Sequence, residues 1–160
     1  LVFATLHANN ANQAIDRIIH FFESEQHEQI LMDLSLNLRA IIAQQLIPTP
    51  DVKGRRAAIE ILLNTKLVGD YIRKGEIHEI KPVMKRSREV GMQTFDQALF
   101  DLYENGDITY RDAIQHADSP NDLRLLIKLE SKSANKTEES ELELSLQSDD
   151  NSAANDNAIS

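Results

Sequence analysis

The sequence predicts an α/β fold that passes into a small all-helical unit. Three features predict this fold. Residues 1–4 form a continuous apolar run, residues 56–63 alternate as a strand does, and the residues after Asn64 follow helical spacing. We therefore expect an α/β portion over residues 1–64, a helical portion over residues 65–130 and an acidic, disordered tail over residues 131–160.

The first element is expected to be a strand that leads into a helix. The run Leu-Val-Phe-Ala at residues 1–4 is apolar on both faces, as in a central strand of a parallel sheet. Asn9 and Asn10 then offer helix caps. Apolar residues follow at helical spacing through residue 22, so we expect a helix there.

A second helix and a hairpin are expected next. The helix starts near Ser24, and its apolar stripe runs as far as Ile41 and Ile42. Residues 44–47 either continue this helix or begin a strand. Two prolines and Gly54 mark a loop, and residues 56–63 should return as the second strand of an antiparallel hairpin.

The remainder should consist of short capped helices. Residues 67–72 give one apolar stripe that Gly75 closes, and Pro82 lies in the first turn of another helix. Residues 94–97 match a capping box, Thr109 precedes a short helix, and the residues from Ser119 onward start the last helix.

Composition and charge exclude several classes of function. The 160 residues include no cysteine, which excludes disulfides, thiolate catalysis and cysteine metal sites. No apolar stretch approaches the roughly 18 residues of a membrane span. The net charge of −9 argues against broad binding to nucleic acid. The chain starts with Leu1 inside an apparent strand, so we expect it to be the C-terminal piece of a longer protein.

The acidic tail and a basic segment are each open to two interpretations. Residues 131–160 carry two lysines against seven acids and contain no aromatic residue, which favours disorder, although alternating leucines at 142–146 could dock as a strand. Lys81, Lys85, Arg86 and Arg88 could form a nucleic-acid surface. A solvated helix face, or contacts with acids of another subunit, fits the acidic total better.

Thr5 and His7 are the first candidate site residues. Ligands of open α/β sheets bind beyond the carboxyl ends of the strands, and these two residues follow the predicted first strand. His7 could hydrogen-bond a phosphate there, or it could be structural. The five glycines are isolated, so the sequence contains no glycine-rich phosphate loop, and no histidine or carboxylate spacing indicates a metal site.

Three stretches of the chain resemble the PilT/PilU-type retraction ATPases of type IV pili. Residues 1–22, LVFATLHANNANQAIDRIIHFF, resemble the family's histidine box and the helix after it. Residues 34–48 and 54–65 resemble a second stretch. Residues 91–129, from GMQTFDQALFDLYENGDITYRD to the last predicted helix, resemble the PilU branch more than the PilT branch.

The resemblance implies a fold, a reaction and partners. The chain would be the C-terminal part of a RecA-like P-loop ATPase motor domain followed by a helical subdomain. Its parent would form hexameric rings in the cytoplasm, at the inner-membrane base of the pilus. It would hydrolyse ATP with Mg²⁺ and couple this to pilin depolymerisation and twitching motility. Expected partners are a paralogous retraction ATPase and the inner-membrane platform protein, with no nucleic acid.

The resemblance also assigns roles to single residues. His7 matches the histidine that faces the γ-phosphate, and Arg17 matches an arginine near the nucleotide, so Thr5, His7 and Arg17 are the expected ATP contacts and His7 the catalytic one. Ile72 and Arg73 match the family's retraction motif, which would couple hydrolysis to movement. The Walker A loop and Walker B segment have no counterpart in this chain, so we expect it to be inactive alone.

Two alternative functions stay open. The parent could be a pilus-assembly or type II secretion ATPase, although such relatives usually carry a four-cysteine zinc module that this chain lacks. It could also be a non-enzymatic adaptor that binds a partner ATPase ring. If it is a retraction motor, it could work autonomously or as an accessory to a paralogue.

Overall fold

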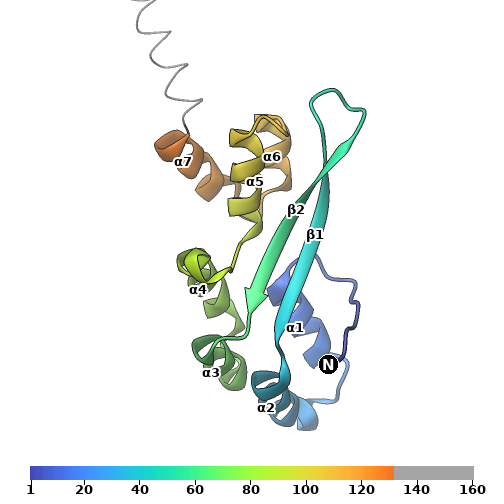
Figure 1. Cartoon of the computed structure of the whole chain (residues 1–160). Helices are drawn as coiled ribbons and strands as arrows, with labels where there is room; N and C mark the ends of the chain where they lie inside the picture. Colours follow the sequence, from blue (N-terminus) through green and yellow to red (C-terminus); the bar gives the residue numbers. More distant parts are fainter. Residues whose placement is uncertain (132–160) are drawn as a thin grey trace, which may run out of the picture.

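A computed structural model of the chain describes residues 1–131. A long antiparallel hairpin runs through the molecule, and helices pack along it in two groups (Figure 1). Its strands are β1 (Ala40–Pro48) and β2 (Arg55–Leu63), and they pair over their whole length, from Ala40 opposite Leu63 to Pro48 opposite Arg55. The predicted hairpin is therefore confirmed, and residues 44–47 belong to a strand. No described helix is long and apolar enough to cross a membrane.

The helices before the hairpin are α1 (Ala11–Ile19) and α2 (His27–Asn37), with a 3-10 turn at Ser24–Gln26 leading into α2. The prediction that the second helix extends through Ile41 and Ile42 is wrong. Leu38 adopts φ −56° and ψ 138°, which ends α2, and the chain enters β1 two residues later. Pairing with β2 outweighs the helical spacing of these isoleucines, because β1 gains a ladder of hydrogen bonds along its length and each of its residues gains a cross-strand neighbour.

The helices after the hairpin are short. They are α3 (Lys66–Lys74), α4 (Ile80–Arg86), α5 (Phe95–Glu104), α6 (Tyr110–His116) and α7 (Pro120–Glu130), with 3-10 turns at Ile77–Glu79 and Arg88–Val90. The predicted caps are confirmed at three places. Gly75 ends α3 with φ +74°, Thr94 and Gln97 form a capping box, and Thr109 caps α6.

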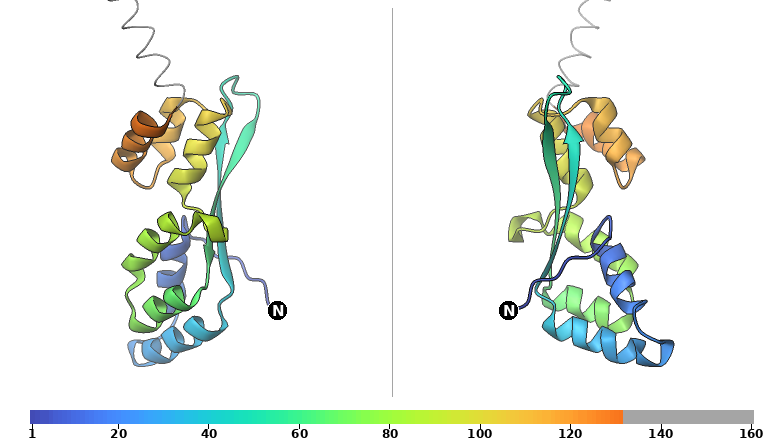
Figure 2. Two further views of the ribbon diagram at one scale, coloured as in Figure 1. Left: turned by 60° about the vertical axis from the view of Figure 1, so that its left-hand side comes forward. Right: turned by 90° about the vertical axis from the view of Figure 1, so that its right-hand side faces the viewer.

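The predicted first strand is absent from the described residues. Residues 1–8 are an extended, mostly exposed segment that crosses the hairpin without pairing to it (Figure 2). Leu1, Val2 and Phe3 are largely exposed. The apolar composition of a buried strand is present, but the segment pairs with neither strand of the hairpin and so lacks the ladder hydrogen bonds that a strand requires.

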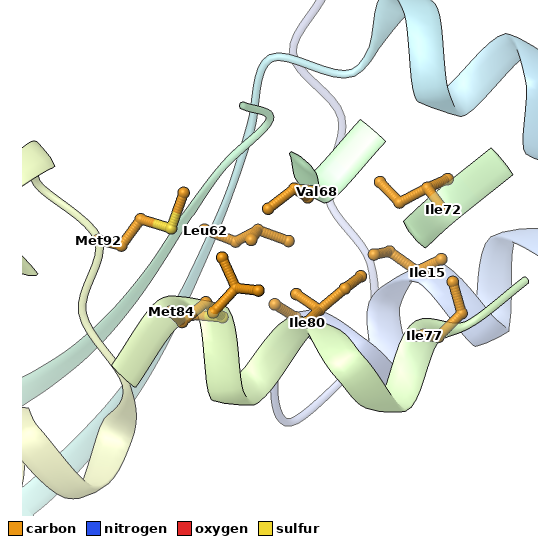
Figure 3. Packing of buried hydrophobic residues seen from close by; sticks show 10 residues of the cluster. Ile15, Leu62, Val68, Ile72, Ile77, Ile80, Met84 and Met92 are labelled. Atoms are coloured by element: carbon orange, nitrogen blue, oxygen red, sulfur yellow. The ribbon is translucent and has the colours of Figure 1, made fainter. Parts of the chain in front are cut away.

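Two hydrophobic clusters flank the hairpin, one at each end of its strands. The first cluster joins α1, α3, α4 and the last part of β2, and it draws on residues from both sides of position 64 (Figure 3). The second cluster joins the other end of the hairpin to α5, α6 and α7. The buried members of the first cluster are Ala11, Ile15, Leu62, Val68, Ile72, Ile77, Ile80, Val83, Met84 and Met92.

The described part of the chain ends just after α7. Ser131, which we expected to begin the acidic tail, is buried, and its hydroxyl donates a hydrogen bond to the Glu104 carboxylate. It therefore belongs to the packed part of the molecule, because α7 carries it back onto α5. The rest of the tail, with its alternating leucines, lies outside the described residues.

Candidate functional site

The start of α1 is fixed by reciprocal capping bonds. The Asn10 side chain accepts a hydrogen bond of 3.0 Å from the backbone N–H of Gln13. The Gln13 side chain in turn accepts one of 3.2 Å from the backbone N–H of Asn9. These bonds hold the residues that follow His7 against the first turn of α1.

His7 and Arg17 line the same surface hollow. The hollow has a volume of about 400 Å³ and is completed by Ala8, Asn9 and Gln13. Gln13 and Arg17 lie one helical turn apart on α1, and both side chains are exposed. The structure thus brings together two of the three residues expected to contact the nucleotide.

Thr5 lies elsewhere. It lines a separate groove between the N-terminal segment and β1, together with Ala14, Ile18 and the first residues of that strand. The direction of the chain reverses locally between the two, since the Ala8 N–H donates to the Leu6 carbonyl at 3.1 Å. Thr5 and His7 do not share a site in this structure.

The hollow is suited to an anion. Arg17 is always charged and offers several N–H donors, and the His7 imidazole can donate a further hydrogen bond. Two backbone donors at the start of α1 are already used, because the Ala11 N–H donates to Glu60 and the Gln13 N–H donates to Asn10. The charged and polar side chains of His7 and Arg17 are the donors that line the hollow itself.

The described residues do not fit a Mg²⁺ site. Magnesium prefers carboxylate oxygens and water at octahedral positions. Residues 1–131 contain no group of three histidine or acidic side chains arranged to hold a metal ion. No step of the chemistry is therefore assigned to Mg²⁺ through these residues.

A partly buried ionic network contacts the start of α1. Glu60 on β2 is fully buried, and its Oε1 accepts a hydrogen bond of 2.7 Å from the N–H of Ala11, the first residue of α1. Its other oxygen, Oε2, lies 2.5 Å from the Nζ of Lys81 on α4. Lys81 also pairs with Asp118, in the turn before α7. The network joins α1, β2, α4 and α7.

The network raises the pKa of the Lys81 ammonium above its usual value. Burial alone would lower the pKa of this ammonium, but hydrogen bonds to Asp118 and Glu60 outweigh that effect. Asp96 lies beside the network and accepts hydrogen bonds from the backbone N–H groups of Asp118 and Ser119, the first of them 2.8 Å long. Burial raises the pKa of the Asp96 carboxyl despite these hydrogen bonds.

The basic segment is not a free cationic surface in this structure. Lys81, Lys85 and Arg88 pair with Asp118, Asp122 and Asp101, which belong to the same chain. Their partners come from α5 and from the start of α7, which fold back beside α4. The contact of this segment with acids of another subunit stays a prediction.

Ile72 and Arg73, the expected coupling residues, lie on different sides of α3. Ile72 is fully buried in the first cluster (Figure 3). Arg73 is half-exposed and forms a 3.5 Å ion pair with Asp70 one turn earlier. Arg39 and Lys66 line a small surface hollow with these two charged residues. Ile72 therefore packs, whereas the Arg73 guanidinium is accessible.

Glu60 and Gln13 are two residues at this site that were not predicted from the sequence. Glu60 occupies the face of β2 that also carries Ala58 and Leu62, both fully buried. An acid between two apolar residues of one strand face was the signal available in the sequence. Gln13 offered no such signal, since its place in the hollow depends on the path of the residues before α1.

Comparison with known proteins identifies the family. No protein-family model matches the chain. Over 133 residues, 83% of this chain, it is 71% identical to the type IV pilus ATPase PilU of Pseudomonas aeruginosa. Over 120 residues it is 33% identical to the type IV pilus retraction ATPase PilT of the same organism. The chain belongs to the PilU/PilT family of type IV pilus ATPases.

Solved structures agree with this family. The crystal structure of the pilus retraction motor PilT with bound ADP matches 78% of this chain with a TM-score of 0.69 and 35% identity. The ATPase DotB of Legionella pneumophila matches in fold with a TM-score of 0.55. The higher identity to PilU than to PilT fits the resemblance to the PilU branch. The chain spans about a third of its PilU/PilT relatives, 35% of PilU and 34% of the PilT chain.

Proposed function

We propose that this chain is the C-terminal part of an ATPase that drives type IV pilus retraction and twitching motility. In this proposal residues 1–64 end a RecA-like core and residues 65–130 form its helical subdomain. The observation that carries the proposal is the 71% identity to PilU over 83% of the chain. The hollow shared by His7 and Arg17 supports it, since both offer donors to phosphate oxygens.

The reaction proposed for the full-length protein is hydrolysis of ATP to ADP and phosphate. Phosphoryl transfer depends on positioning and on stabilising the charge that develops on the transferred group. His7 would donate a hydrogen bond to that charge, and Arg17 would hold the phosphates by a charge-assisted contact. The remaining phosphate and Mg²⁺ contacts would come from the rest of the protein.

The assembly and its location are part of the same proposal. The full-length protein would form a hexameric ring in the cytoplasm, at the inner-membrane base of the pilus. It would work with a paralogous retraction ATPase and contact the inner-membrane platform protein. Arg73, accessible on α3, would take part in coupling hydrolysis to that machinery, and Ile72 would keep α3 in place.

The experiment is a histidine substitution in the full-length protein. His7→Ala should lower the ATPase rate about a hundredfold, because a donor aimed at developing charge contributes roughly 3 kcal/mol. His78→Ala is the matched control, since His78 is an exposed histidine away from the hollow. Ring assembly, measured by light scattering, should be unchanged in both variants. Equal ATPase rates in the two variants would show that His7 is not catalytic.

A further inference from the structure

Glu60 is more costly in its position than an apolar residue would be. It is fully buried on a strand face shared with Ala58 and Leu62, where an uncharged side chain would pack without a desolvation penalty. Its carboxylate is neutralised by Lys81 at 2.5 Å. Packing of the core does not require an acid at this point, so we looked to the contacts of the two carboxylate oxygens for its role.

The oxygen atom Oε1 fixes the start of α1. Ala11 is fully buried, so its N–H cannot bond to water, and Glu60 accepts that hydrogen bond at 2.7 Å. The two residues are 49 positions apart in the sequence, so this bond sets where α1 begins relative to the hairpin. Lys81 holds the same carboxylate from α4 and is itself held by Asp118.

The position of Ala11 determines where the residues of the hollow lie, both before and after it in the chain. Toward the N-terminus, the Asn10 and Asn9 bonds to Gln13 hold the residues next to His7. Toward the C-terminus, α1 carries Arg17 as part of one rigid helix. The hydrogen bond from the Ala11 N–H to Glu60 therefore determines the positions of both His7 and Arg17.

We infer that Glu60 is a positioning residue for ATP hydrolysis: it places His7 and Arg17 through the hydrogen bond from Ala11, and Lys81 ties that placement to the C-terminal helices. This inference rests on the function proposed above. Glu60 itself lines neither hollow nor groove of the site, so it acts through α1 and not by touching the nucleotide.

Two substitutions of Glu60 separate position from charge. Glu60→Gln keeps an acceptor oxygen at the same reach but loses the charge. Glu60→Asp keeps the charge but withdraws the oxygens by about one carbon–carbon bond, roughly 1.5 Å. If Glu60 acts by position, kcat of the full-length protein stays within about twofold for Gln and falls about tenfold or more for Asp, because misplacement by ~1 Å costs up to ~100-fold.

The kcat values of the Glu60→Gln and Glu60→Asp variants are then measured in a protein that also lacks the His7 and Arg17 side chains. In a His7→Ala/Arg17→Ala background, Glu60→Asp should change kcat by less than about twofold, since the groups it misplaces are gone. KM for ATP is recorded throughout, and light scattering and thermal unfolding confirm that each variant is assembled and folded. A merely structural role would lower activity equally in both backgrounds.

Each outcome bears on the inference. It is overturned if Glu60→Gln lowers kcat as much as Glu60→Asp or more. It is also overturned if Glu60→Asp lowers kcat by the same factor with and without His7 and Arg17. Failure of the proposed function looks different: the wild-type protein would not hydrolyse ATP, and the inference would fall with it. Wild-type hydrolysis with an unaffected Glu60→Asp variant would overturn the positioning role alone.

Discussion

The Nζ of Lys81 lies 2.5 Å from Oε2 of Glu60, and this acid has no exposed surface. The two residues come from α4 and β2, 21 positions apart in the sequence. A buried carboxylate of this kind is tolerated only with a cation and hydrogen-bond donors around it. Lys81 supplies the cation, and the Ala11 N–H supplies a hydrogen-bond donor.

Removing the cation should destabilise the fold strongly. Lys81→Met leaves Glu60 buried without its counter-charge, which costs about 3–5 kcal/mol. Lys85→Met is the matched control one turn along α4, where the lysine is mostly exposed and its contact with Asp122 is 3.6 Å long. The control should cost less than about 1 kcal/mol. Urea unfolding of both variants measures the difference, and equal costs would contradict the prediction.

The stabilising contribution of Lys81 should be lost at alkaline pH. The pKa of the Lys81 ammonium is raised above its ordinary value of 10.5 because, although burial opposes charge, the hydrogen bonds to Asp118 and Glu60 outweigh it. A raised pKa in the folded state gives stability that is complete below pH 10.5 and is lost as the pH rises through the folded pKa. The free energy difference between wild type and Lys81→Met should therefore shrink above pH 10.5. Urea unfolding of both proteins at a series of pH values measures this difference, and a level difference would refute the prediction.

Alanine substitutions at Ile72 and Arg73, the two residues of the expected retraction motif, should have different effects on stability and on motility. Ile72→Ala opens a cavity in the first cluster and should cost about 2–5 kcal/mol, because Ile72 is fully buried. Arg73→Ala removes only a half-exposed ion pair and should cost less than about 1 kcal/mol. In the full-length protein, Arg73→Ala should keep the ATPase rate and weaken twitching. Loss of ATPase activity in Arg73→Ala would assign this residue to the active site instead.

Gly75 should resist substitution because of its backbone conformation. It ends α3 with φ +74°, so Gly75→Ala places a side chain in the left-handed region at a cost of about 1 kcal/mol. Gly54→Ala is the control, since Gly54 is not among the positive-φ glycines and an added Cβ would meet Thr49 at an ordinary 3.6 Å. Thermal unfolding should show a lower midpoint for Gly75→Ala only. A normal midpoint would mean that α3 can end without the left-handed turn.

Local signals in the sequence predicted most of the described fold. The capping residues Thr94, Thr109 and Gly75 each act through neighbours within a few positions, so their roles are legible from sequence. The strand at residues 1–4 was mispredicted because a strand exists only with a partner beside it. The end of α2 was mispredicted because Ile42 faces Ile61 across the hairpin, a contact that helical spacing does not reveal.

The candidate site was predicted in part. The family resemblance supplied His7 and Arg17, and the structure brings them to one hollow. Thr5 was expected there because it follows the predicted strand, but that strand is absent and Thr5 lines a separate groove. Glu60 and Lys81 were missed as a pair because nothing local links them: their contact exists only once α4 has folded back onto β2.

The hairpin also connects the two hydrophobic clusters. Its strands are continuous for nine residues each, with one end in the first cluster and the other in the second. A bridge between Ile61 and Gln93 ties the segment that connects α4 to α5 to the same strand. The hairpin and this bridge therefore join the α1 end of the described molecule to its α7 end through continuous hydrogen-bonded backbone.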